Sequence, residues 1–326
     1  MTRSEGGRRR VLVLLNPGAG QGPVLDEVQR RLEARGGPDL ELVVPDPVDQ
    51  HRQLGDAETA LESGVDAVVV CGGDGMVSRA VNLVAQRAVP LGIVPTGSGN
   101  DFARVLGIPR RTSEAVRQLL RALDQPELPL RSVDALRLRS SFEPGSRWVA
   151  NSVNIGFDAR VNQRANLQRR VPRRLRYLLA LAQEVPRFRS VEFGVQIGAR
   201  EEAVQQSALI CIQNGSFIGG GIPLSREGRP DDGWAEVSHI APLSRPGLVV
   251  LFPLLMMRVH RWLRPLVTQR LRHIRIHVPE GVPVFADGDE LHSGTSESGR
   301  GADVEAELIP GALLLLNQAF SRGSPR

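Results

Sequence analysis

Residues 67–75 read Ala67-Val-Val-Val-Cys-Gly-Gly-Asp-Gly75, a short apolar run that ends in a glycine-rich turn. A run of this length, rich in Val and closed by Gly, predicts a buried β-strand. The glycines after it allow positive φ and a close approach of the backbone to a ligand, so amide N–H groups can face a phosphate. One such loop alone is weak evidence, because tight turns look the same.

The same alternation of apolar runs and amphipathic segments continues on both sides. Strands are predicted at Val11–Leu15, Leu40–Val44 and Leu91–Val94, and helices at Val24–Ala34, Gln50–Glu62 and Val77–Arg87. Strands that alternate with helices predict a parallel sheet covered by helices on both faces. Ligands of such sheets bind beyond the carboxyl ends of the strands, so we expect the chemistry in the loops there.

Two more glycine loops end strands of this sheet. They are Asn16-Pro-Gly-Ala-Gly20 and Pro95-Thr-Gly-Ser-Gly-Asn-Asp101. Three such loops at one sheet edge, two of them carrying an Asp, favour a phosphate site over plain turns. The chain has no Lys, which excludes the Walker G-x-x-x-x-G-K-[ST] loop, and the first strand is not followed by the G-x-G-x-x-G dinucleotide fingerprint.

From about residue 130 the strands follow one another mostly without helices. They are predicted at Ser132–Leu138, Trp148–Ile155, Glu192–Ile197, Ser207–Gln213, Trp234–His239, Ile274–Val278, Val282–Ala286 and Val304–Leu308, with Arg-rich helices near 160–184 and 246–264. This pattern predicts a second, mainly antiparallel β domain. We place an α/β domain at 8–129 and the β-rich domain at 130–326. The segment 311–320 either completes the second domain or returns to the first.

The composition points to an anionic partner. The 326 residues hold 41 Arg, no Lys and 36 acidic residues, for a net charge of +5. Such an excess suits phosphate, nucleic acid or an anionic membrane surface. Two cysteines, Cys71 and Cys211, exclude a disulfide framework and a Cys-based zinc site, and they fit the cytoplasm. Neither a signal peptide nor a membrane-spanning segment is predicted.

Several motifs together resemble the catalytic domain of diacylglycerol kinases and the wider superfamily of bacterial, sphingosine and ceramide lipid kinases. They are Val70-Cys-Gly-Gly-Asp-Gly75, Pro90-Leu-Gly-Ile-Val-Pro-Thr-Gly-Ser-Gly-Asn-Asp-Phe-Ala-Arg104, Asn151-Ser-Val-Asn-Ile-Gly-Phe-Asp-Ala159, Gln213-Asn-Gly-Ser-Phe-Ile-Gly-Gly-Gly221, Pro230-Asp-Asp-Gly233 and Ala286-Asp-Gly-Asp289. The resemblance covers about residues 10–310. It implies an α/β nucleotide-binding domain joined to a β-sandwich-like domain, with the site between them.

The resemblance also implies roles for individual residues. ATP would lie along Asn16, Gly72, Gly73, Gly75, Thr96, Gly97, Gly99 and Asn100, with Arg169, Arg170 and Arg176 reaching its triphosphate. The catalytic carboxylates would be Asp74, Asp101, Asp287 and Asp289, with Asp101 linked to Mg²⁺ or its waters. Either Asp74 or Asp287 would accept the proton of the acceptor hydroxyl. A structural Mg²⁺ would bind Asp232 and the carbonyl groups of Arg229 and Trp234, unless this is a plain Asp-Gly turn.

Three residues depart from the family pattern. Met76 stands where the family commonly has Thr, Gln21 replaces a Lys that pairs with an Asp at position 134, and Asp289 replaces a Glu. These departures keep other functions open: a sphingoid or ceramide-type kinase, a NAD kinase, or an inactive lipid-binding regulatory module. A NAD kinase would have an Asn-Glu pair where this chain has Asn100-Asp101.

We therefore expect an ATP-dependent lipid kinase, with diacylglycerol as the first candidate acceptor and phosphatidic acid as the product. It would act as a cytoplasmic enzyme at an anionic membrane surface, without nucleic acid, and a homodimer stays open. The apolar stretch Leu248–Met257 either lines a slot for acyl chains or forms an ordinary core helix.

Overall fold

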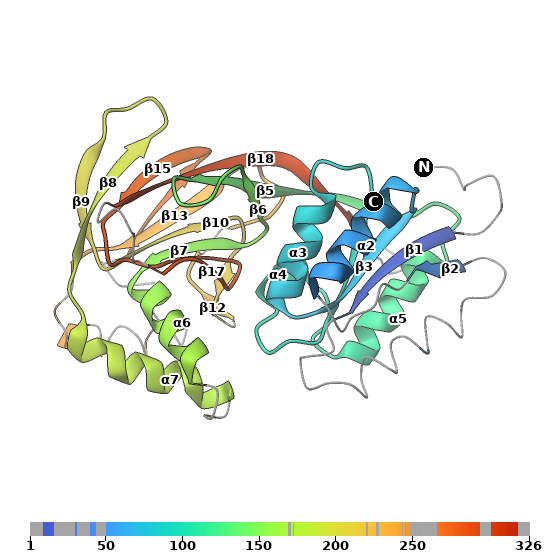
Figure 1. Ribbon diagram of the computed structural model, residues 1–326, viewed down its shortest axis with the longest axis horizontal. Helices are drawn as coiled ribbons and strands as arrows, with labels where there is room; N and C mark the ends of the chain where they lie inside the picture. Colours follow the sequence, from blue (N-terminus) through green and yellow to red (C-terminus); the bar gives the residue numbers. More distant parts are fainter. Residues whose placement is uncertain are drawn as a thin grey trace. The chain divides into compact units, whose positions relative to one another are not determined.

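In the computed structural model the chain forms two compact units (Figure 1). The structure describes residues 9–15, 30, 40–43, 50–168, 171, 173–219, 221–225, 228–242, 244, 246–247, 254, 266–293 and 301–318. The first unit holds the residues up to Asp134 and those from Gly311 onward, and the second holds Ala135–Pro310. Most of the predicted helices 24–34 and 246–264 lie outside the described residues, as do Asn16 and Gln21.

The first unit is built on a parallel sheet. Its strands run in the order β2 (Leu40–Val43), β1 (Arg9–Leu15), β3 (Ala67–Gly72), β4 (Leu91–Pro95) and the C-terminal part of β18 (Ala302–Leu316). Every pair in this order is parallel, and Leu315 of β18 faces Leu91 of β4. The predicted parallel sheet is confirmed.

Helices cover this sheet because its strands are apolar on both faces. Val11, Val13, Val69 and Cys71 form a cluster with α5 (Thr112–Leu123), while Leu12, Leu14, Val68 and Val70 on the other face are also buried. The helices α2 (Gln50–Glu62) and α3 (Asp74–Val84) contact β1 and β3, and the short α4 spans Asp101–Val105. α3 begins three residues before the predicted start, directly after the extended Gly73.

The end of the described chain is fastened to β4. Gln318 is 3% exposed, and its side-chain amide donates to the carbonyl of Ile93 at 3.0 Å while its carbonyl accepts the Ile93 N–H at 2.8 Å. The side chain thus continues the pairing that Leu315 and Leu91 begin, and it satisfies both polar groups of a buried strand residue.

The second unit is a pair of largely antiparallel sheets. One contains the first part of β18, β15 (His273–Val278), β8 (Val191–Ile197) and β9 (Ala203–Ser207), with β5 (Leu130–Ser140) and β6 (Arg147–Val149) alongside. The other runs β14 (Leu266–Leu271), β13 (Ala235–Ile240), β10 (Leu209–Gln213), β7 (Ser152–Gly156), β16 (Val284–Ala286) and β17 (Asp289–His292). A small hairpin pairs β11 (Phe217–Ile218) with β12 (Ile222–Pro223).

Side chains of β10 show how this unit is layered. Ile210 and Ile212 join the core between the two sheets, while Leu209 and Cys211 point to the opposite face. There they pack with α6 (Phe157–Leu167) and α7 (Arg173–Glu184), which Figure 1 shows beside β7 and β10. A strand covered on both faces has to be apolar throughout, which explains the continuous run Leu-Ile-Cys-Ile. The predicted fold class is confirmed.

Two predicted elements are divided in the structure. The strand expected at Trp148–Ile155 is interrupted at Ala150 and Asn151 between β6 and β7, and the helix expected at 160–184 is two helices. The short helix η2 (Val185–Arg187) follows α7. The interruption of the strand has a clear cause, because the amides of Ala150 and Asn151 bind a carboxylate instead of a neighbouring strand.

Replacing Gln318 by Ala should destabilise the first unit by about 2 kcal/mol, because the buried N–H and C=O of Ile93 would lose their partners. Urea denaturation measures the change. Gln125→Ala is the control, since the Gln125 side chain bonds only one exposed carbonyl in the described contacts. Equal stability of the two variants would contradict this role of Gln318.

Candidate functional site

The glycine loops after β3 and β4 lie against each other. The amide of Thr96 donates to the carbonyl of Gly72 at 2.9 Å, which extends the strand pairing into the loops. Beyond it, a Cβ added to Gly97 would lie 2.6 Å from the Cα of Gly73. Real Cβ contacts are never so short, so Gly97 is required for this close approach of two backbones.

Asp74 joins the two loops. Its Oδ2 accepts the Asn100 N–H and its Oδ1 accepts the Asp101 N–H, both at 2.8 Å. Burial raises the pKa of this carboxyl, and the hydrogen bonds from Asn100 and Asp101 partly oppose the rise. Asp74 therefore anchors the start of α4 to the start of α3, and it does so best as a carboxylate, because a protonated oxygen accepts less well.

The Asn100 side chain closes the loop further. Asn100 has φ +52, and its carboxamide bonds both sides of Gly97: Oδ1 accepts the N–H at 3.1 Å and Nδ2 donates to the carbonyl at 2.7 Å. Arg104, one turn into α4, donates to the Gly99 carbonyl at 3.1 Å and lies 3.8 Å from Asp101. The loop 96–101 is thus held from several directions before any ligand arrives.

Two other residues of this region differ in what they offer a ligand. The Thr96 hydroxyl is buried and has no hydrogen-bond partner among the described residues. Met76, by contrast, is 2% exposed and belongs to the packed face of α3, so its role is in the core. In the described structure, no contact of the glycine loops needs a hydroxyl group at position 76.

Asp287 plays a parallel part in the second unit. Its Oδ2 accepts the Ala150 N–H at 2.8 Å, and its Oδ1 accepts the amides of Asn151 at 2.9 Å and Ser152 at 3.0 Å. The residue is 8% exposed and has φ +48, a left-handed conformation that suits the Asp-Gly turn between β16 and β17. Three backbone amides therefore fix the orientation of the Asp287 carboxylate.

The family motifs of the second unit converge on this carboxylate. Asn214 donates from Nδ2 to the Ala150 carbonyl at 3.0 Å, and its own N–H donates to the Asn151 carbonyl at 2.8 Å. Asn151 in turn donates to the Phe217 carbonyl at 2.9 Å. The segments 150–154, 213–217 and 286–289, far apart in the sequence, thus form one hydrogen-bonded group.

Asp289 and Glu290 leave this turn in different directions. Asp289 pairs with Arg147 of β6 at 2.9 Å, and Glu290 accepts from Gln163 of α6 at the same distance. The Arg147 partner of Asp289 is not apparent from the sequence, because Arg147 lies outside every recognised motif. The carboxylate that replaces the family Glu is therefore already engaged within its own unit.

Asp134 has a structural role in the first unit. It is 4% exposed and accepts the N–H of Gly311, which has φ +63, at 2.8 Å. A buried carboxylate needs such a partner, so Asp134 does not depend on the missing Lys to be satisfied.

The predicted triphosphate arginines are placed only in part. Arg169 and Arg170 lie outside the described residues. Arg176 turns its Nε to the Val171 carbonyl at 2.6 Å. In the same basic run, Arg160 donates to the Gly281 carbonyl and Arg164 pairs with the buried Glu184, which ties α6 to α7. Contact of Arg176 with a nucleotide stays a prediction.

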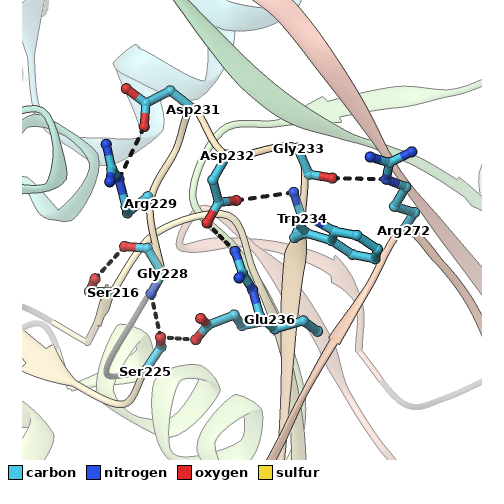
Figure 2. A network of polar contacts seen from close by, with 11 residues as sticks. Ser216, Ser225, Gly228, Arg229, Asp231, Asp232, Gly233, Trp234, Glu236 and Arg272 are labelled. Atoms are coloured by element: carbon cyan, nitrogen blue, oxygen red, sulfur yellow. Dashed lines mark hydrogen bonds and ion pairs between the residues drawn. The ribbon is translucent and has the colours of Figure 1, made fainter.

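The predicted metal turn is occupied by protein groups (Figure 2). Asp232 Oδ1 accepts the Trp234 N–H at 3.1 Å, and Oδ2 pairs with the guanidinium of Arg270. The Arg272 Nε donates to the Gly233 carbonyl at 3.1 Å. Among the described residues, no group of three or more His, Cys, Asp or Glu side chains is arranged to hold a metal. This turn does not fit a Mg²⁺ site as it stands.

Sequence comparisons match both units to known families. Residues 10–127 match the diacylglycerol kinase catalytic domain, and residues 151–317 match the YegS C-terminal NAD kinase beta sandwich-like domain. A diacylglycerol kinase of Mycobacterium tuberculosis is 32% identical over 283 residues, which cover 86% of this chain and 88% of that protein.

No helix among the described residues is long and apolar enough to cross a membrane.

Solved structures show the same fold. A putative diacylglycerol kinase from Bacillus anthracis superposes with a TM-score of 0.69 at 22% identity, covering 95% of this chain and 98% of that one. The yeast NADH kinase in complex with NADH gives a TM-score of 0.56 at 13% identity, covering 95% and 80%. These similarities establish the architecture of the chain, and they do not identify its substrate.

Replacing Asp74 by Asn should loosen the two glycine loops. The amide NH₂ cannot accept, so one of the two loop N–H groups loses its partner, at a cost of about 1–3 kcal/mol. Hydrogen exchange of the backbone amides of Asn100 and Asp101 should become faster. The free energy of unfolding, measured by urea denaturation, should fall. Asp56→Asn is the matched control, because Asp56 forms only an exposed pair with Arg52 among the described contacts. Unchanged exchange in Asp74→Asn would refute the anchor.

Proposed function

The chain belongs to the diacylglycerol kinase catalytic-domain family of lipid kinases, and on that premise we propose that it transfers the γ-phosphoryl group of ATP to the hydroxyl of diacylglycerol. The 32% identity to a diacylglycerol kinase over most of both chains supports this acceptor. Sphingoid bases, ceramide and NAD are the competing acceptors, and NAD rests on a fold likeness alone.

The paired glycine loops are the observation that carries the proposal. They follow neighbouring parallel strands at the carboxyl edge of the sheet, where ligands of this architecture bind. Asp74 and Asn100 hold them in one conformation, so phosphate groups of MgATP would meet backbone that is already ordered. The buried Thr96 hydroxyl is a further group that a phosphate oxygen could satisfy.

Asp74 and Asp287 both remain candidates for the residue that orients the acceptor hydroxyl and takes its proton. Phosphoryl transfer needs little covalent work from the protein, so a carboxylate has only to be ionised, oriented and within reach. Asp287 is oriented by three backbone amides, and Asp74 by two.

We place the reaction at the surface of an anionic membrane, as a working proposal for a peripheral enzyme. A lipid acceptor has to be reached from its bilayer, and the net charge of +5 suits anionic headgroups. In the second unit, Leu167 at the end of α6 is 80% exposed and Leu179 of α7 is 40% exposed. Exposed leucines on neighbouring helices support contact with the acyl boundary.

An acceptor panel tests the function directly. Purified protein with radiolabelled ATP and Mg²⁺ should label diacylglycerol in mixed vesicles much more than sphingosine, ceramide or NAD. Labelling of NAD alone would contradict lipid kinase activity, and absence of labelling on every acceptor would favour a regulatory module. Vesicles with and without anionic lipid test the membrane proposal separately, by co-sedimentation.

Single-turnover transfer with Asp74→Asn and Asp287→Asn tests the carboxylates. Loss of the acceptor base should lower the rate roughly 10²–10⁴-fold. Because burial raises the pKa of Asp74, activity that depends on its ionised form should fall on the acid side at a higher pH than an ordinary Asp would give. That acid limb should disappear in Asp74→Asn. Near-normal rates in both variants would exclude the mechanism.

A further inference from the structure

The turn at residues 229–234 is closed by arginine side chains from the neighbouring part of the second unit. Arg270 of β14 pairs with the Asp232 carboxylate, and the next arginine along, Arg272, lies 4.6 Å from the centre of the Trp234 ring while it bonds the Gly233 carbonyl. Arg229 lies 3.6 Å from Asp231. Figure 2 shows Arg272 and Trp234 on one side of the turn and Arg229 with Asp231 on the other.

Arginine side chains already provide the positive charge that the carboxylates of this turn need. Three guanidinium groups, of Arg229, Arg270 and Arg272, lie at a turn whose own carboxylates are those of Asp231 and Asp232. Mg²⁺ binds oxygen ligands, and carboxylates supply the charge that holds it. Here both Asp232 oxygens have protein partners, and a divalent ion would have to displace a guanidinium.

We propose that Arg270 does at this turn what a bound divalent cation would otherwise do. A cation here would bind the carboxylate of the turn to its surroundings. The guanidinium of Arg270 makes the same connection from the adjacent strand β14. Arg270 faces Glu236 across the β13–β14 ladder, only four residues beyond Asp232 in the sequence. The pairing of β13 with β14 therefore places the guanidinium of Arg270 beside the turn.

The tie matters because the turn leads to the candidate site of this unit. Just before Arg229, Gly228 accepts from the Ser216 hydroxyl at 2.6 Å and donates to Ser225 Oγ at 2.9 Å. Ser216 adjoins Phe217, whose carbonyl accepts from Asn151 beside the Asp287 carboxylate. A chain of hydrogen bonds and short backbone steps thus runs from Asp232 to Asp287, so Arg270 acts at a distance as a positioning residue.

The experiment compares stability and metal binding in the full-length protein without nucleotide. The melting temperature of the wild-type chain should be the same in Mg²⁺ and in chelator. Arg270→Ala should melt roughly 2–6 °C lower in chelator and recover part of that loss in Mg²⁺, because the Asp232 carboxylate is then left without the guanidinium of Arg270. Tb³⁺ luminescence sensitised by Trp234 should appear in Arg270→Ala and stay at background in the wild type.

The matched control is Arg272→Ala, which removes an arginine from the same turn and leaves the Asp232 pair intact. It should show no response to Mg²⁺. The double variant Arg270→Ala with Asp232→Asn should lose the Mg²⁺ response and the Tb³⁺ signal. Where Arg270→Ala does not fold, Arg270→Gln serves in its place.

Two results would overturn the proposal. The first is a wild-type chain that Mg²⁺ stabilises and that Asp232→Asn makes insensitive, because the turn would then hold a metal despite its arginines. The second is an Arg270 variant whose melting temperature and Tb³⁺ luminescence ignore the metal, because the guanidinium would then replace nothing. Neither result depends on which acceptor the kinase uses.

Discussion

Backbone amides bound by a buried carboxylate are the constraint on which both candidate sites depend. Asp74 gathers two amides in the first unit, and Asp287 gathers three in the second. The first set lies where the loop after β4 enters α4, and the second set spans the break between β6 and β7 and the first residue of β7. A buried N–H without a partner costs about 1–3 kcal/mol, so removing either carboxylate would release its loop. The Asp residues are therefore structural whether or not they also take a proton.

Arginine side chains make many further contacts within each unit. Arginine is concentrated in two stretches, residues 160–176 and 258–275. Described arginine side chains of both stretches bond other residues of their own unit: Arg160, Arg164 and Arg176 in the first and Arg270, Arg272 and Arg275 in the second. Several of these bonds go to carbonyl oxygens, which a planar guanidinium with five donors can reach while it also pairs with a carboxylate. The many arginines therefore serve internal contacts within each unit as well as attraction to anions.

The sequence predicted the parts of the fold that depend on local pattern. Four of the five strands of the first sheet, β1 to β4, and the helix Gln50–Glu62 lie where apolar periodicity places them. It did not predict contacts between distant segments. No pattern pairs Arg147 with Asp289, or directs Asp134 to Gly311, because each depends on how two strands far apart in the chain are aligned. The break at Ala150 has the same origin, since the carboxylate that binds its amide comes 137 residues later.

Each unit satisfies its own carboxylate, so the proposed phosphate site of the first unit does not depend on the residues that would choose the acceptor. The loops of the first unit are ordered by Asp74, Asn100 and a glycine contact, all of which form on folding and cost nothing further when a nucleotide binds. Under the proposed function, these backbone loops would bind the phosphate groups of ATP, whichever acceptor is used. Discrimination between acceptors must therefore come from side chains outside the loops. The second unit is the place to look for them, because its segments 150–154, 213–217 and 286–289 are joined around Asp287 by side-chain carboxamides that can be changed without altering the phosphate loops.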